Sequence, residues 1–169
     1  GATWKNVTPQ GLEECLINAI DVSPFDKGTA YIATTRYKFN NHRPGLYKTT
    51  DYGASWTKID NGIPSNAFTR VVREDDVRKD LLYAGTELGV FLSWDGGKNW
   101  SPFQLNLPVT PITDLRVHKG NLIASTSGRS FWILDDLSVL RQYKKEMPAF
   151  SVYQPTGAYL ANGGSELNS

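Results

Sequence analysis

Hydrophobic and polar residues alternate with a period of two along most of this chain, as they do in strands that bury one face. The clearest pair of such segments, 18–22 and 29–34, flanks a turn rich in proline, aspartate and glycine. Two further alternating segments, 45–49 and 55–59, follow, so the pattern predicts a unit of four strands. A helical period is sustained nowhere, and only residues 11–18 allow one short turn. The sequence therefore predicts an all-β protein.

The same order of strands recurs twice more along the chain. We expect strands at 69–72, 81–86, 89–93 and 99–103 in the second unit, and at 113–117, 121–125, 131–134 and, with a weaker pattern, 140–143 in the third. The second strand of each unit is small and apolar, as expected where neighbouring sheets cover both faces of a strand. These strands contain Tyr31-Ile32-Ala33, Leu82-Tyr83-Ala84 and Leu122-Ile123-Ala124. The core should therefore lie between stacked sheets.

The turn between the third and fourth strands also repeats in sequence. Its complete copies are Thr49-Thr50-Asp51-Tyr52-Gly53-Ala54-Ser55-Trp56 and Ser93-Trp94-Asp95-Gly96-Gly97-Lys98-Asn99-Trp100, and Gly1-Ala2-Thr3-Trp4 is a truncated copy. The spacing between equivalent tryptophans is close to the roughly 40–50 residues per repeat of propeller blades. In the third unit the segment 134–138 has neither the glycine nor the tryptophan. That turn is degenerate.

The order Ser or Thr, any residue, Asp, any residue, Gly, two residues and Trp resembles the Asp-box, or bacterial neuraminidase (BNR) repeat. On these turns the chain is similar to the Asp-box β-propellers, which include sialidases, xyloglucan-type glycoside hydrolases, sortilin-type receptors and photosystem II assembly factors. The resemblance implies blades of four antiparallel strands, about three of them, in a partial propeller over residues 1–146 that opens with the last strand of another blade. Residues 147–169 would then form a post-propeller segment and polar tail.

A second stretch, residues 127–137, resembles part of the large secreted bacterial Asp-box proteins. It implies a C-terminal propeller fragment of a secreted or periplasmic protein. Three blades are too few to close a ring, since propellers typically have at least four. We therefore expect the open sheet edges to be covered by further blades, by a second chain, or by residues 149–153 acting as an edge strand.

The repeated turn has a structural explanation for each of its side chains. The Asp carboxylate accepts hydrogen bonds from backbone N–H groups of its own turn, the Gly supplies a positive φ, and the Trp fills the space beside the neighbouring sheet. Paired carboxylates are also the mark of a glycosidase, but Asp51 and Asp95 belong to different blades. We therefore assign structural roles to Thr49, Asp51, Gly53, Trp56, Ser93, Asp95, Gly97 and Trp100.

Ligand-binding residues are expected on the opposite face, where the second and third strands of each blade connect. The first of these loops, 35–44, is long and contains Arg36, Tyr37, His42 and Arg43. This composition suits stacking on a sugar ring or holding a carboxylate, although a solvated surface loop explains it equally well.

The corresponding loops of the next two blades contain Glu87 and Arg129. An ion pair between these two residues is the simple expectation. As an alternative, the segment 83–87 resembles one that precedes an acidic residue in xyloglucanase-like enzymes, which would make Glu87 a candidate general acid.

Composition narrows the remaining possibilities. The chain has 18 basic and 17 acidic residues, and this balance favours neither nucleic acid nor an anionic membrane as a partner. With Cys15 as the one cysteine, no intrachain disulfide forms. Its histidines, His42 and His118, are expected on opposite faces, so we predict no metal site, and without a nucleotide-binding fingerprint we predict no cofactor.

Three functions remain open on the sequence alone. The leading hypothesis is a scaffold that binds a glycan or a protein through the loop 35–44 together with Glu87 and Arg129. The second is part of a glycoside hydrolase whose remaining catalytic residues lie outside this chain. The third is a structural module that self-associates, or pairs with the remaining blades of a longer chain, through its open sheet edges.

Overall fold

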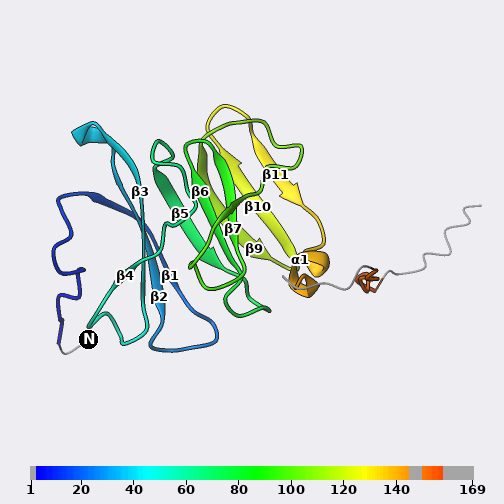
Figure 1. Ribbon diagram of the computed structural model, residues 1–169, viewed down its shortest axis with the longest axis horizontal. Coiled ribbons are helices and arrows are strands. Elements are labelled where there is room, and N and C mark those ends of the chain that lie inside the picture. The colour runs from blue at the N-terminus through cyan, green and yellow to red at the C-terminus, as the bar shows by residue number, and fades with distance from the viewer. Residues whose placement is uncertain (1–2, 145–149, 158–169) are drawn as a thin grey trace, which may run out of the picture.

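The computed structural model describes residues 3–144 and 150–157, which form three antiparallel sheets (Figure 1). The first sheet contains β1 (Leu16–Val22), β2 (Ala30–Arg36), β3 (Asn41–Thr49) and β4 (Thr57–Lys58) in that order. The second contains β5 (Thr69–Glu74), β6 (Leu82–Thr86), β7 (Gly89–Ser93) and β8 (Ser101–Pro102). The third contains β9 (Ile112–His118), β10 (Asn121–Thr126) and β11 (Phe131–Leu134). Each sheet is therefore an up-and-down blade of sequential strands.

The blades stack face to face, with β5 against β1 and β2, and β9 against β5 and β6. Figure 1 shows them side by side, from the blue and cyan strands through the green to the yellow. One apolar cluster between the first two blades contains Tyr31, Leu46 and Phe91. A second, between the last two, contains Tyr83 and Leu115. The core lies between blades, and the expected all-β partial propeller is confirmed.

The end of the third blade differs from the sequence expectation. Residues 140–143, expected as a fourth strand, fall largely in the short helix α1 (Ser138–Gln142). Leu137 is completely buried and its N–H donates to the carbonyl of Gly120 at 2.8 Å, which directs the chain across the end of the sheet. Without the glycine and tryptophan of the repeated turn, no hairpin forms here.

The terminal segments also differ from expectation. Residues 150–153 form no strand, and Ala149 lies outside the described residues, so the expected edge strand is absent from the part that the structure describes. The short turn expected in 11–18 gives way to β1 from Leu16 onward. The boundary expected at residue 146 lies outside the described residues. The described part contains no helix with the length and hydropathy of a membrane span.

Candidate functional site

The first complete copy of the repeated turn is closed by its own side chains. The Thr49 hydroxyl donates to Asp51 Oδ1 at 2.8 Å and accepts the Gly53 N–H at 2.9 Å. The backbone N–H and the hydroxyl of Ser55 donate to the two oxygens of Asp51 at 2.8 and 2.6 Å. Asp51 is thus engaged within its own turn, on the face opposite the candidate binding loops.

The second copy repeats this geometry. The Ser93 hydroxyl donates to Asp95 Oδ1 at 2.8 Å and accepts the Gly97 N–H at 2.9 Å. The backbone N–H and side-chain amide of Asn99 donate to Asp95 at 2.9 and 2.8 Å. Because each carboxylate is enclosed in its own hairpin, the two do not form a catalytic pair.

The tryptophan of each copy donates a hydrogen bond to the outermost segment before its own blade. Trp100 Nε1 donates to the Ile59 carbonyl at 2.5 Å, and Trp56 Nε1 donates to the Val7 carbonyl at 2.8 Å. The turn glycines have φ of +83° at Gly53 and +91° at Gly97, a region that favours glycine. A Cβ on either would lie within 2.7 Å of the same Val7 or Ile59 side chains. The turn therefore joins consecutive blades as well as closing a hairpin.

Acid should weaken these turns. Hydrogen bonds from the side chain and backbone of Ser55, and then from Thr49, lower the pKa of Asp51 to about 2. Hydrogen bonds from Asn99 and Ser93 lower that of Asp95 although its partial burial opposes them. As the pH falls below about 4 the unfolded chain binds protons that the folded turns resist. The stabilisation present above pH 4 is therefore expected to disappear as the pH falls towards 2.

The measurement is the free energy of unfolding in urea at pH 6 and at pH 2.5. Asp51→Asn and Asp95→Asn should each be less stable than the parent at pH 6 and lose less stability on acidification. Asp135→Asn lies outside both turns and is the matched control. Its stability at pH 6 and its loss of stability on acidification should equal those of the parent. An unchanged acid sensitivity in the two turn variants would contradict this account.

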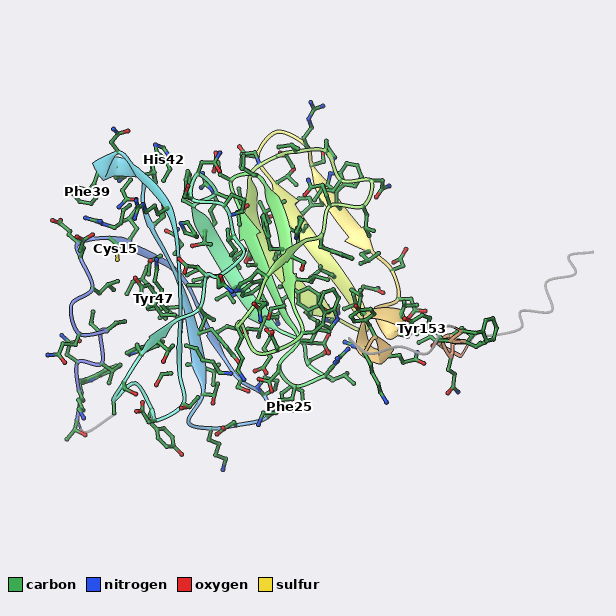
Figure 2. The ribbon with its side chains drawn as sticks, viewed as in Figure 1. Cys15, Phe25, Phe39, His42, Tyr47 and Tyr153 are labelled. Atoms are coloured by element: carbon green, nitrogen blue, oxygen red, sulfur yellow. The ribbon has the colours of Figure 1, made fainter. Side chains whose placement is uncertain are left out.

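The long loop between β2 and β3 is held against the second blade by aromatic contacts. Its 3-10 turn η1 (Tyr37–Phe39) places the Tyr37 ring 5.6 Å from the ring of Phe68, nearly parallel, and the His42 ring lies 5.7 Å from the same ring. Figure 2 shows Phe39 and His42 at the tip of this loop. Tyr37 and His42, two of the expected ligand-binding residues, therefore anchor the loop to Phe68.

Glu87 is paired within its own blade. Arg70 donates to Glu87 Oε2 from Nε at 3.0 Å and from Nη2 at 2.8 Å, and its guanidinium carbon lies 5.1 Å from the centre of the Phe68 ring. The expected partner, Arg129, lies on the β10–β11 hairpin, where its backbone contacts Thr126 and Trp132. The expected Glu87–Arg129 ion pair is wrong. Glu87 lies opposite Phe68, whose carbonyl accepts the Glu87 N–H at 3.1 Å, and Arg70 reaches it from the irregularity in β5 between Thr69 and Val71.

Sequence reasoning missed Phe68 and Arg70, the centre of this cluster. The available signal was their position at the start of β5: Phe68 directly precedes this strand and Arg70 is its second residue, beside the loop that follows β6.

Arg36 and Arg43 face away from this cluster. Both line a polar pocket of about 370 Å³ between residues 11–13 and the first blade. Arg36 is already engaged: its side chain pairs with Glu13, and its Nε donates to the Glu14 carbonyl at 3.0 Å. Arg36 therefore fastens the N-terminal segment to the blade.

Two other cations line the pocket. Arg43 forms no ion pair with any residue of the described chain, and Lys58, which also lines the pocket, pairs with Asp60 at 2.7 Å. A neighbouring hollow of about 290 Å³ is lined by Arg43 and Lys58 as well. These two side chains therefore stand on a ridge between two polar hollows.

The pocket wall also contains polar groups of β2 and β3. The Thr35 hydroxyl, in a residue that is 3% exposed, has no hydrogen-bond partner. Tyr47, labelled in Figure 2, lines the same pocket, and burial raises the pKa of its phenol. A carboxylate in the pocket could accept hydrogen bonds from Arg43, Lys58 and the Tyr47 hydroxyl. Across the described residues, no three His, Cys, Asp or Glu side chains gather as metal ligands would.

No family model and no curated protein matches this sequence. Several solved structures are similar in fold. A GH74 enzyme of Niastella koreensis superposes with a TM-score of 0.56 and 19% identity, over 71% of this chain and 21% of that one. YCF48 bound to D1 peptide gives 0.52 and 19%, over 72% and 36%. The GH74 xyloglucanase from Xanthomonas campestris gives 0.51 and 17%, over 68% and 20%.

This chain therefore spans about a fifth of the length of the GH74 structures and about a third of that of YCF48. At these identities the likeness concerns the fold alone. The neighbours are β-propellers, and the three stacked sheets described above have the form of propeller blades. The chain thus has the fold of a partial β-propeller.

Proposed function

We propose that this chain is an Asp-box β-propeller module of a secreted or periplasmic protein, acting as a scaffold that binds an acidic glycan or an acidic segment of a protein. The common chemistry of these ligands is a carboxylate. The two turns support the Asp-box assignment, because Asp51 and Asp95 make matching sets of hydrogen bonds within their own hairpins. The fold neighbour YCF48 has a bound peptide, which supports recognition of a protein ligand.

The pocket beside the loop 35–44 carries this proposal. It combines an unengaged guanidinium on Arg43, the ammonium group of Lys58 and the phenol of Tyr47. Glu13 is the one acidic residue of its lining, and Arg36 neutralises it. The pocket thus offers more positive than negative charge, and its cationic groups can donate charge-assisted hydrogen bonds to a carboxylate. Arg129 does not line this pocket.

An alternative is that the chain forms part of a xyloglucanase-like or sialidase-like glycoside hydrolase, with Glu87 as general acid. The GH74 enzymes among the fold neighbours favour this alternative. The Arg70–Glu87 contact disfavours it, because two hydrogen bonds from Arg70 already engage Glu87 Oε2, whereas a general acid must reach the glycosidic oxygen.

Replacing Arg43 by alanine should weaken binding of a carboxylate ligand by about 10- to 100-fold, the range expected for loss of a charge-assisted hydrogen bond. The probes are an oligogalacturonate and an oligoglutamate peptide, measured by calorimetric titration at fixed salt. The melting temperature should not change, because Arg43 is exposed and makes no side-chain contact that holds the fold.

Lys38→Ala is the control, since it removes one positive charge from the same loop without touching the pocket. It should leave the affinity within about twofold, which allows for long-range electrostatics. Equal losses in both variants would indicate a diffuse charge effect, and failure of the parent protein to bind either probe would overturn the proposal. Arg36→Ala is unsuitable, because it also releases the N-terminal segment.

A further inference from the structure

The pocket beside the loop 35–44 already contains one carboxylate, that of Glu13. Arg36 Nη1 donates to Glu13 Oε2, and both residues line the pocket. The Glu13 side chain is nevertheless 68% exposed, whereas that of Arg36 is 27% exposed. The protein therefore covers most of the donor of this ion pair and leaves the acceptor largely in solvent.

Glu13 belongs to residues 11–14, which precede β1 and lie in no strand or helix. Figure 1 shows this part of the chain in dark blue, beside the first blade. Within the described residues, Arg36 is the one residue of the blades that donates hydrogen bonds to it. One bond goes to the Glu13 carboxylate, and the other goes from Nε to the Glu14 carbonyl at 3.0 Å. The hydrogen bonds between this segment and the blades therefore all involve a single guanidinium.

The Arg36 guanidinium has two contacts that do not depend on the Glu13 side chain. Its Nε bond goes to a backbone carbonyl. Its central carbon lies 5.8 Å from the centre of the Phe39 ring, a separation at which a cation is attracted to an aromatic face. These contacts would keep the guanidinium in place if Glu13 moved away. The bond to Glu13 is thus the one that another carboxylate could replace.

Separating Glu13 from Arg36 should require little free energy. Ion pairs with an exposed partner stabilise proteins only slightly, because water solvates the separated charges and screens their attraction. A second carboxylate on Arg36 would restore charge-assisted hydrogen bonds of the same kind. Glu13 therefore lowers the affinity of a ligand that needs Arg36, but it does not exclude that ligand.

Arg36 and Arg43 lie close enough to bind the same ligand. Arg36 faces Asn41 across β2 and β3, and Arg43 is two residues further along β3. Residues offset in this way across two strands are separated by about 7–8 Å. Both arginines line the pocket, and Lys58 lines it beside Arg43. The pocket therefore has one place for a carboxylate at Arg43 and Lys58, and a second at Arg36, where Glu13 lies.

We infer that the pocket binds a ligand with two or more carboxylates, and that Glu13 occupies the place of the second one until the ligand displaces it. The first carboxylate binds Arg43 and Lys58, and the second replaces Glu13 on Arg36. This inference rests on the proposed function, to which it adds the number of acidic groups on the ligand and a competitor within the chain. A ligand with one carboxylate gains nothing by displacing Glu13, so the pocket favours polyacids.

The test compares Glu13→Gln with the parent protein by calorimetric titration of the oligoglutamate peptide at fixed salt. The amide keeps the size of the side chain but removes the charge that competes for Arg36. The affinity should therefore rise about 3- to 10-fold, because there is no ion pair to break and no like charge beside the ligand. Glu14→Gln is the matched control, since Glu14 contacts Arg36 only through its backbone carbonyl. It should change the affinity by less than about twofold.

A second probe tests the number of carboxylates. It is the same peptide with all but one glutamate replaced by glutamine. Its affinities for the parent and for Glu13→Gln should agree within about twofold, because one carboxylate can use only one of the two places.

Three results would overturn the inference. If the parent binds oligoglutamate and Glu13→Gln binds it no more tightly, or if the single-glutamate peptide gains as much affinity, the inference fails and the proposed function stands. Equal gains in Glu13→Gln and Glu14→Gln would attribute the effect to net charge and would also overturn it. If neither the parent nor Glu13→Gln binds oligoglutamate or oligogalacturonate, the proposed function fails and the inference fails with it.

Discussion

Trp100→Ala is expected to lower the free energy of unfolding by about 3–5 kcal/mol, the usual loss for a buried tryptophan or phenylalanine replaced by alanine. The Trp100 side chain is almost completely buried between the first two blades, within a cluster that includes Leu46 and Phe91. Its removal leaves a cavity and deprives the Ile59 carbonyl of its indole donor. Urea unfolding followed by circular dichroism measures the loss.

Trp56→Ala is the matched control, because Trp56 occupies the same position in the preceding turn. It makes the equivalent hydrogen bond to Val7 but is only partly buried and belongs to neither core cluster. Its replacement should lower the free energy of unfolding by about half as much or less. Equal losses would mean that the turn, rather than the contact between blades, is the source of the stability.

Asp75→Ala is the second large effect, with an expected loss of about 3–5 kcal/mol, typical of breaking a buried ion pair from one side. Asp75 is completely buried. Its carboxylate accepts hydrogen bonds from the Tyr83 hydroxyl at 3.0 Å and from Arg141 Nε at 3.0 and 3.1 Å, and also from two backbone N–H groups. Alanine would leave the phenol and the guanidinium without this partner. The loss is measured by urea unfolding.

Asp76→Ala removes the same charge one residue later and serves as the control. Asp76 also pairs with Arg141, at 2.6 Å, but its side chain is exposed, so the expected loss is below about 1 kcal/mol. In a double variant, Arg141→Met should recover part of the stability lost in Asp75→Ala, because the guanidinium left unpaired is then removed. If the two aspartate variants were equally destabilised, burial would not be the cause of the effect.

The Asp75 contact also explains the irregular end of the third blade. Arg141 lies on α1, 66 residues from Asp75 in the sequence. Trp94 adds to this contact, since its Nε1 donates to the Leu140 carbonyl at 3.3 Å and its ring lies 4.9 Å from that of Tyr143, tilted by 46°. The alternation of residues 140–143 predicted a strand, but these long-range contacts to the second blade bring the segment there as a helix.

The contacts of the side chains in the candidate site could not be predicted from the sequence for a similar reason. Arg36, Tyr37, His42 and Arg43 were identified as one ligand-binding group, yet the backbone turns two of them toward Phe68 and the other two toward the pocket. Sequence spacing places residues in the same loop but does not say which blade each side chain will contact. The division of the loop into an anchoring face and a pocket face depends on the stacking of two sheets.

Most strands of the blades and both complete turns could be predicted from the sequence, because the features that define them are local. Alternation sets the face of each strand, and the hydrogen bonds of Asp51 and Asp95 join residues two to four positions apart. The partners of Glu87 and Arg141 and the polar pocket beside Arg43 became evident only from the folded structure. Each of these depends on distant segments brought together by the packing of one blade on the next, which no local pattern specifies.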